Sequence, residues 1–132
     1  MSRPVRVVLV EDNEVFREAL ETLLALRPGV EIVASLADGS EAVSVCSTLE
    51  PDVVLLDYRL PGLDGVEITS AVRHACPEVA IVCLTAEVTP REAEALLAAG
   101  AKECVLKDAS LDEIVEAVLR GAEKTEETTS WS

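Results

Sequence analysis

Residues 53–57 read Val-Val-Leu-Leu-Asp, four consecutive apolar residues followed by an acid. A short apolar run without polar alternation is typical of a parallel strand that is buried on both faces of its sheet. Four other segments are predicted strands, at residues 5–10, 30–34, 79–84 and 104–106. The sequence therefore predicts five strands, of which the third delivers Asp57 at its carboxyl end.

Apolar residues at helical spacing occupy the intervals between the predicted strands and follow the last one. Residues 58–65 contain Pro61 and Gly62 and predict a loop before the third helix. Capping residues, prolines and glycines mark the helix ends. The predicted helices run from Glu14 to the Arg27-Pro28-Gly29 turn, from a Ser40 cap to the residue before Pro51, from Val66 to Cys76, from a Thr89 cap to Gly100, and from a Ser110 cap to Gly121.

The strict alternation of strands and helices argues for an α/β, doubly wound fold, with one parallel sheet covered by helices on both faces. Its crossovers should be right-handed. A chain of 132 residues has room for one such domain, at roughly 100 to 200 residues per domain. We place the domain at residues 1–121 and interpret residues 122–132, rich in Glu, Thr and Ser, as a flexible polar tail or the start of a linker.

The charge of the chain excludes one broad class of function. Eleven Lys and Arg residues against 25 Asp and Glu residues give a formal net charge of −14, which repels a phosphate backbone. The basic residues form no stripe, and one Trp, one Tyr and one Phe provide no stacking platform for bases. We therefore expect that this chain itself contacts no nucleic acid.

Neither a membrane segment nor a disulfide framework is expected. The longest apolar run, at residues 79–84, is far below the roughly 20 residues that span a bilayer. The first apolar run is too short and too soon followed by acids for a signal peptide. Cys46, Cys76, Cys83 and Cys104 show no Cys-x-x-Cys spacing and lie in apolar patterns, so we expect reduced, largely buried thiols. These features predict a cytoplasmic protein.

Polar residues follow four of the five predicted strands. Glu11 and Asp12 follow the first, Asp57 the third, Thr85 the fourth and Lys107 the fifth. Ligands of an open parallel sheet bind outside the carboxyl ends of its strands, so we expect these side chains to converge. Clustered carboxylates repel one another, and a hard divalent cation such as Mg²⁺ relieves that repulsion. The pattern predicts a Mg²⁺-assisted phosphoryl site, although the first two acids taken alone would also suit the start of a helix.

Four strings at the ends of predicted strands resemble the receiver domain of bacterial two-component response regulators. They are Val-Leu-Val-Glu-Asp-Asn at 8–13, Val-Val-Leu-Leu-Asp-Tyr-Arg-Leu-Pro-Gly-Leu-Asp-Gly at 53–65, Leu-Thr-Ala at 84–86 and Val-Leu-Lys-Asp-Ala-Ser at 105–110. The resemblance covers roughly residues 5–121 and implies a flavodoxin-like sheet with strand order 2-1-3-4-5. That order places the first and third strands side by side.

The resemblance implies which residues accept the phosphoryl group and hold the metal. Asp57 would be the phosphoacceptor, attacking a phosphoryl group to give an aspartyl phosphate. Asp12, Asp57 and the main-chain carbonyl of Arg59 would bind Mg²⁺ directly, and Glu11 would act largely through water. A carboxylate is already the nucleophile, so the chemistry needs no general base and depends on positioning and charge neutralisation.

The resemblance also implies how the transferred group is held. Thr85 would hydrogen-bond the phosphoryl group, Lys107 would pair with one of its oxygens, and the backbone amide of Ala86 would donate to another. On this interpretation the protein is not an enzyme with a separate substrate. It catalyses only its own Mg²⁺-dependent phosphorylation and dephosphorylation at Asp57.

Three positions are expected to tune or change the switch. Cys104 stands three residues before the lysine, where the family usually has a Tyr or Phe whose ring reorients on phosphorylation, so we expect switching by a weaker or different route. Arg59 and Glu87 lie two positions beyond the acceptor and the threonine, where the family tunes phosphoryl lifetime. We expect their opposite charges to pair across the entrance of the site.

The resemblance implies the partners as well. Asp108 follows the lysine where Pro is common, which resembles the subgroup whose output is a LuxR-type helix-turn-helix. A sensor histidine kinase would then supply the phosphoryl group. The output would be transcription regulation through a DNA-binding domain outside this chain, and a homodimer is compatible with it.

Two other classes of function stay open on the residues alone. Phosphatases of the haloacid dehalogenase type also use a strand-end Asp with Mg²⁺, but they require Asp-x-Asp where this chain has Asp57-Tyr58-Arg59. The second alternative is a pseudo-receiver, an interaction module that works without phosphorylation. The intact set of polar residues argues against it, and Cys104 argues for it.

Overall fold

A computed structural model describes residues 3–59 and 65–123, which contain a five-stranded parallel sheet. The strand order is β2-β1-β3-β4-β5, which confirms the predicted order and places β1 beside β3. Every neighbouring pair of strands in this sheet is parallel. The strands are β1 (Val5–Val10), β2 (Val30–Leu36), β3 (Val53–Asp57), β4 (Ala80–Thr85) and β5 (Glu103–Leu106).

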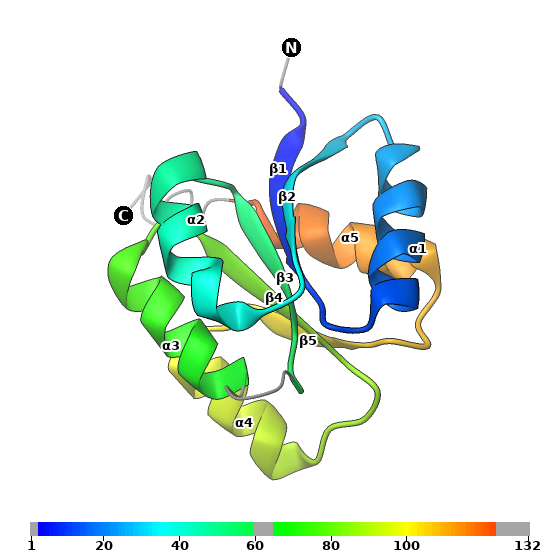
Figure 1. Ribbon diagram of the computed structural model, residues 1–132. Helices are drawn as coiled ribbons and strands as arrows, with labels where there is room; N and C mark the ends of the chain where they lie inside the picture. The colour runs from blue at the N-terminus through cyan, green and yellow to red at the C-terminus, as the bar shows by residue number, and fades with distance from the viewer. Residues whose placement is uncertain (1–2, 60–64, 124–132) are drawn as a thin grey trace, which may run out of the picture.

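Helices cover both faces of the sheet, as Figure 1 shows. α1 and α5 lie on one face, and α2, α3 and α4 lie on the other. The alternation of strand and helix predicted from the sequence is therefore confirmed along the described chain. The helices are α1 (Glu14–Ala25), the short 3₁₀ helix η1 (Gly39–Glu41), α2 (Ala42–Leu49), α3 (Gly65–Ala75), α4 (Pro90–Ala99) and α5 (Leu111–Gly121).

Each central strand divides its side chains between two cores. In β3, Val53 and Leu55 pack with α1 and α5, whereas Val54 and Leu56 pack with α2, α3 and α4. All four are fully buried. Because successive strand residues point to opposite faces, a strand covered on both sides must be apolar at every position. This is why the strand at 53–57 reads as an uninterrupted apolar run.

The helix ends follow the local signals in the sequence. Thr89 and Ser110 both form complete capping boxes with the glutamate three residues later. Gly100 ends α4 at a φ of 117°, in the left-handed region, and a Cβ there would lie 2.8 Å from Cγ of Arg73. Glycine is required at this position both for the backbone angle and for the close approach.

The start of the second helix differs from the prediction. Ser40 does not cap α2; the carboxylate of Asp38 instead accepts a hydrogen bond from the Ser40 amide at 2.6 Å and starts a turn of 3₁₀ helix. α2 then begins at Ala42 without a side-chain cap. Because Asp38 caps this 3₁₀ turn, Ser40 lies inside the turn and not at the position that precedes a helix.

Two segments of the prediction lie outside the described residues. These are the loop around Pro61 and Gly62, and the tail beyond Glu123. The last helix ends at Gly121, where the helical pattern ended in the sequence. Among the described residues, no helix is both long and apolar enough to cross a membrane.

Candidate functional site

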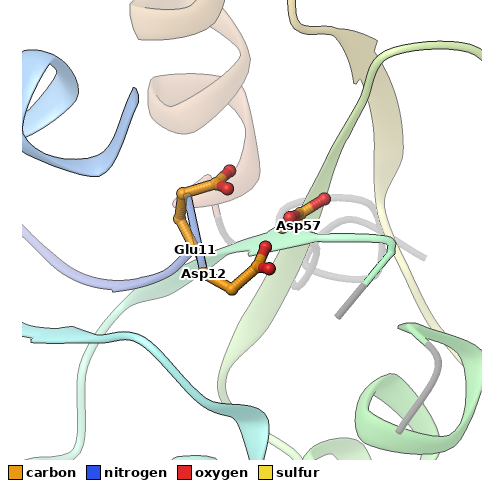
Figure 2. Close-up of side chains that lie close together, drawn as sticks. All are labelled: Glu11, Asp12 and Asp57. Atoms are coloured by element: carbon orange, nitrogen blue, oxygen red, sulfur yellow. The ribbon is translucent and has the colours of Figure 1, made fainter. Parts of the chain in front are cut away.

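Three acidic side chains meet at the carboxyl edge of the sheet, as predicted. Asp57 is the last residue of β3, and Glu11 and Asp12 directly follow β1, which pairs with β3. One carboxylate oxygen from each of the three lies within 4.8 Å of the others, and Figure 2 shows Asp12 and Asp57 facing one another. This cluster has the oxygen donors that a hard divalent cation prefers.

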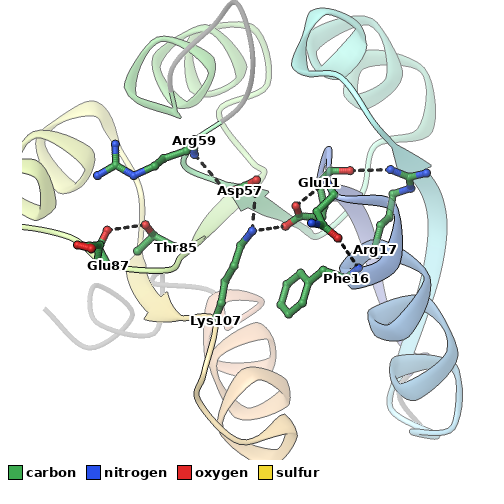
Figure 3. Close-up of polar contacts among 9 residues, drawn as sticks. Glu11, Phe16, Arg17, Asp57, Arg59, Thr85, Glu87 and Lys107 are labelled. Carbon is green, nitrogen blue, oxygen red and sulfur yellow. Dashed lines mark hydrogen bonds and ion pairs between the residues drawn. The ribbon is translucent and has the colours of Figure 1, made fainter.

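Lys107 directly follows β5 and reaches the cluster from there. Its Nζ lies 2.9 Å from Oε1 of Glu11 and 3.4 Å from Oδ2 of Asp57 (Figure 3). The Lys107 amide donates to the Thr85 carbonyl at 2.8 Å, which extends the β4–β5 pairing to this residue. The Phe16 ring lies 4.8 Å from Nζ on another side. Lys107 is thus a fixed cation placed between two carboxylates.

Glu11 is completely buried and is held at both its side chain and its backbone. Its Oε2 accepts the amide of Asn13 at 2.9 Å, while the lysine ammonium pairs with Oε1. The Arg17 guanidinium donates to the Glu11 carbonyl at 2.9 Å, as the dashed lines of Figure 3 indicate. A buried carboxylate needs such partners because an unpaired charge in the interior is costly.

Asp57 is only 3% exposed, and its charged form is disfavoured there. Burial, followed by the nearby charge of Glu11, raises the pKa of Asp57 to about 7. The Arg59 amide, which donates to Oδ1 at 3.1 Å, and the Lys107 ammonium act in the opposite direction. The ionised Asp57 therefore gains stability from any further cation placed among the three acids.

The charge on Lys107 is in turn favoured by the site. Its partial burial acts to lower the pKa, but the carboxylates of Glu11 and Asp57 outweigh burial and raise the pKa above its ordinary value. Lys107 is consequently a permanent positive charge at neutral pH. Such a group can neutralise developing negative charge without being reorganised first.

The predicted phosphoryl-binding threonine reaches the same edge, but its hydroxyl is engaged elsewhere. Thr85 ends β4 and is fully buried. Its Oγ1 donates to the carbonyl of Glu87 at 2.7 Å (Figure 3). Ala86, whose amide was the other predicted donor, lies between them and is exposed. To donate to a group on Asp57, the Thr85 hydroxyl must first release the Glu87 carbonyl.

The predicted pairing of Arg59 with Glu87 is wrong. The Arg59 guanidinium pairs with Oε2 of Glu92 at 3.4 Å. Glu92 stands in the capping box of α4, whose hydrogen bond with the Thr89 amide lowers the pKa of Glu92, and Arg59 lowers it further. The capping box fixes this carboxylate in the first turn of α4, within reach of the Arg59 guanidinium.

Cys104 lies in β5, where the resemblance implied an aromatic ring. It is half-buried and stands in register with Cys83 of β4. A thiol thus lies against the neighbouring strand at this position. Switching by a weaker or different route, which the sequence suggested for this position, therefore stays a prediction.

Sequence reasoning missed three residues that complete the site. Phe16 and Arg17 were not among the predicted site residues, yet they contact Lys107 and Glu11 respectively. Glu92, the partner of Arg59, was not predicted to belong to the site either. The sequence offered a local cue only for Arg17, which lies six residues after Glu11 at the end of a predicted strand. The other two contacts join distant segments and left no local pattern.

Comparisons with known proteins agree with this geometry. Residues 7–119 match the response regulator receiver domain family. The chain is 36% identical over 115 residues to the transcriptional regulatory protein LnrK of Bacillus subtilis, covering 87% of this chain and 52% of that protein. It is 34% identical over 119 residues to the nitrate/nitrite response regulator NarP of Escherichia coli, covering 90% and 55% respectively.

A solved structure of a response regulator receiver domain has the same fold as this chain. The signal receiver domain of the response regulator NarL from Mycobacterium tuberculosis superposes with a TM-score of 0.87 at 37% identity, covering 92% of this chain and 98% of that one. The chain spans just over half the length of LnrK and NarP. Because the family match covers nearly the whole described fold, this chain belongs to the response regulator receiver domain family of two-component signalling proteins.

Proposed function

We propose that this chain is a Mg²⁺-dependent phosphoacceptor: a sensor histidine kinase phosphorylates Asp57, and the phosphorylated domain changes the activity of a transcriptional output outside this chain. The observation that carries this proposal is the position of Asp57. Its carboxylate is buried among two further acids and one fixed ammonium at the carboxyl edge of the sheet.

The donor set fits Mg²⁺. Three carboxylates lie within reach of a single ion, and a cation bound there would favour the ionised form of Asp57, whose pKa is raised by burial and by the charge of Glu11. Asp12 and Asp57 would hold the ion, with the Arg59 carbonyl, while Glu11 is already occupied by Lys107 and would act through water. When bound, Mg²⁺ supplies charge neutralisation for phosphoryl oxygens.

The residues of the chain perform the remaining tasks. A carboxylate oxygen of Asp57 forms the new bond to phosphorus while the bond from phosphorus to the donor breaks, so the nucleophile needs no proton removed once it is ionised. Lys107 lies 3.4 Å from that carboxylate and can follow the developing charge. Thr85 leaves the Glu87 carbonyl to donate to the phosphoryl group, and this exchange starts the conformational change.

The output is proposed from the relatives. LnrK is described as a transcriptional regulatory protein, and a similar structure from Staphylococcus aureus, at 26% identity, is described as a DNA-binding response regulator of the LuxR family. We place the output of this chain in the same class, with a homodimer and a cytoplasmic location as parts of the proposal. The protein is a switch that turns over only its own phosphoryl group, and not an enzyme with a free substrate.

The test is phosphorylation by a small donor. The whole chain is incubated with acetyl phosphate, with and without Mg²⁺, and its intact mass is followed. We expect the addition of one phosphoryl group that requires both Mg²⁺ and Asp57, and that is lost in Asp57→Asn. Asp108→Asn, which removes an exposed acid next to Lys107, is the matched control and should be phosphorylated normally.

Two outcomes would contradict the proposal. One is the absence of any phosphoryl gain while circular dichroism shows an intact fold, which would favour the pseudo-receiver. The other is repeated turnover of p-nitrophenyl phosphate, which would favour a phosphatase.

A further inference from the structure

Two cysteines on neighbouring strands lie opposite one another beneath the phosphoryl site. Cys83 of β4 and Cys104 of β5 are register partners. Both belong to the core on the side of α2, α3 and α4, so their side chains point to the same face of the sheet. Adjacent strands lie about 4.8 Å apart, which is within the Cα separation of about 4.4 to 6.8 Å that a disulfide spans.

The two thiols also interact with each other. The neighbouring thiol raises the pKa of Cys83 and lowers the pKa of Cys104, so the thiolate form is favoured at Cys104. Cys83 is fully buried, whereas Cys104 is half-buried. The pair therefore consists of one thiol that solvent can reach and one that it cannot.

A hydroxyl group accompanies the buried thiol. Thr69 of α3 is fully buried, its Oγ1 has no hydrogen-bond partner among the described residues, and its nearness to Cys83 acts to lower the pKa of that thiol. A hydroxyl in this place can donate to Cys83 when the thiol loses its proton. The apolar core thus contains a polar group where a sulfur anion would form.

We propose that Cys83 and Cys104 are a reversible redox pair, which peroxide oxidises to a disulfide across β4 and β5. In the first step the Cys104 thiolate attacks one peroxide oxygen, the O–O bond breaks, hydroxide leaves, and the sulfur becomes a sulfenic acid. In the second step the Cys83 sulfur attacks Cys104, the S–S bond forms, the S–O bond breaks, and the thiol proton leaves with the hydroxyl group as water. Two thiols and one peroxide thus give one disulfide and two waters.

The other two cysteines are less suited to this reaction. Cys46 of α2 is 1% exposed, and burial together with the nearby Cys76 raises the pKa of its thiol to about 11. Cys76 contacts the hydroxyl of Ser47, with 3.6 Å between Sγ and Oγ. A low pKa is what makes a thiol react with peroxide, and the pKa of Cys46 is shifted in the opposite direction.

The proposed disulfide would lie close in sequence to two phosphoryl-binding residues. Cys83 lies two residues before Thr85, and Cys104 lies three residues before Lys107. A covalent bond between them holds β5 against β4 directly below the two phosphoryl-binding side chains. The redox chemistry itself does not depend on the proposed phosphorylation and is tested without it.

The test counts and maps thiols in the whole chain. The reduced protein is treated with a small excess of hydrogen peroxide, and free thiols are alkylated after denaturation. We expect the number of free thiols to fall from the four in the sequence to two. Trypsin should release the fragment of residues 74–91 joined to that of residues 103–107, tandem mass spectra should place the bond at Cys83, and dithiothreitol should separate the two fragments.

Matched variants keep the test decisive. The double variant Cys46→Ala with Cys76→Ser should still lose both remaining thiols, and Cys104→Ala should retain its thiols under the same treatment. Oxidation in concentrated guanidinium chloride should give mixed pairings, since only the folded sheet selects one. The proposal is overturned if native wild type retains all its thiols, if the fragment of residues 18–59 is found in the disulfide, or if Cys76 is joined to Cys104.

Discussion

Replacing Asp57 by Asn should stabilise this protein when Mg²⁺ is absent. The side chain is 3% exposed and carries a pKa raised to about 7 by burial and by Glu11. At pH 8 the wild-type domain therefore holds an ionised group that the fold disfavours. The amide of Asn has nearly the same shape and carries no charge, so the variant is relieved of this penalty.

The magnitude follows from the pKa. A rise from the ordinary 3.8 to about 7 corresponds to at most about 4.5 kcal/mol, because each pKa unit is worth about 1.4 kcal/mol. Solvent reaches the exposed Asp12 side of the cluster and screens the charges, and the variant also loses the contact with Lys107. Allowing for screening, we expect the variant to gain about 2 kcal/mol in free energy of unfolding.

The pH dependence has a definite sign. Between pH 3.8 and about 7 the folded state keeps the Asp57 proton that the unfolded state has lost. The free energy of unfolding of the wild type should therefore fall relative to Asp57→Asn as pH rises through this window, and level off above it. Urea unfolding followed by far-ultraviolet circular dichroism at several pH values measures the difference.

The same unfolding measurement with Mg²⁺ present tests whether an ion removes the difference in stability between wild type and Asp57→Asn. An ion that binds only the folded state stabilises it by about 2.7 kcal/mol at a hundredfold excess over its Kd. We expect saturating Mg²⁺ to stabilise the wild type and to leave Asp57→Asn almost unchanged, which would remove the advantage of the variant. The reasoning is refuted if Asp57→Asn is less stable than the wild type at pH 8 without Mg²⁺, or if the difference does not depend on pH.

Three further substitutions test single contacts. Lys107→Ala leaves a buried carboxylate without its cation, so urea unfolding should show a loss of about 3 kcal/mol, and an unchanged midpoint would contradict the ion-pair argument. Arg59→Ala breaks an exposed ion pair with Glu92 and should change stability by less than about 0.5 kcal/mol. Arg59→Ala and Glu92→Gln should both accelerate loss of the phosphoryl group to the same extent, and different decay rates for the two variants would argue against a shared role. Gly100→Ala should cost about 1 to 2 kcal/mol because of its φ of 117° and the close Arg73 side chain. Gly29→Ala, with no heavy atom within 4 Å of its Cβ, is the control and should leave the thermal midpoint unchanged.

The fold was predictable because its signals are local. A strand buried on both faces must be apolar throughout, as residues 53–56 are, and a capping box needs only residues that lie within one turn, as Ser110 and Glu113 do. Where two local signals competed, the prediction was wrong: Asp38 accepted the Ser40 amide and displaced the predicted cap. The general position of the site was also predictable, since parallel strands end at one edge of the sheet.

The partners within the site were decided by the tertiary structure. The sequence alone determined that Glu11, Asp57 and Lys107 would meet, but the order of strands and the length of each side chain decided that the ammonium would lie between the two carboxylates. In the same way the β4–β5 register, and no local pattern, placed Cys83 against Cys104. Residue type and strand ends are properties of short segments, whereas a contact between distant segments depends on how the whole sheet is assembled.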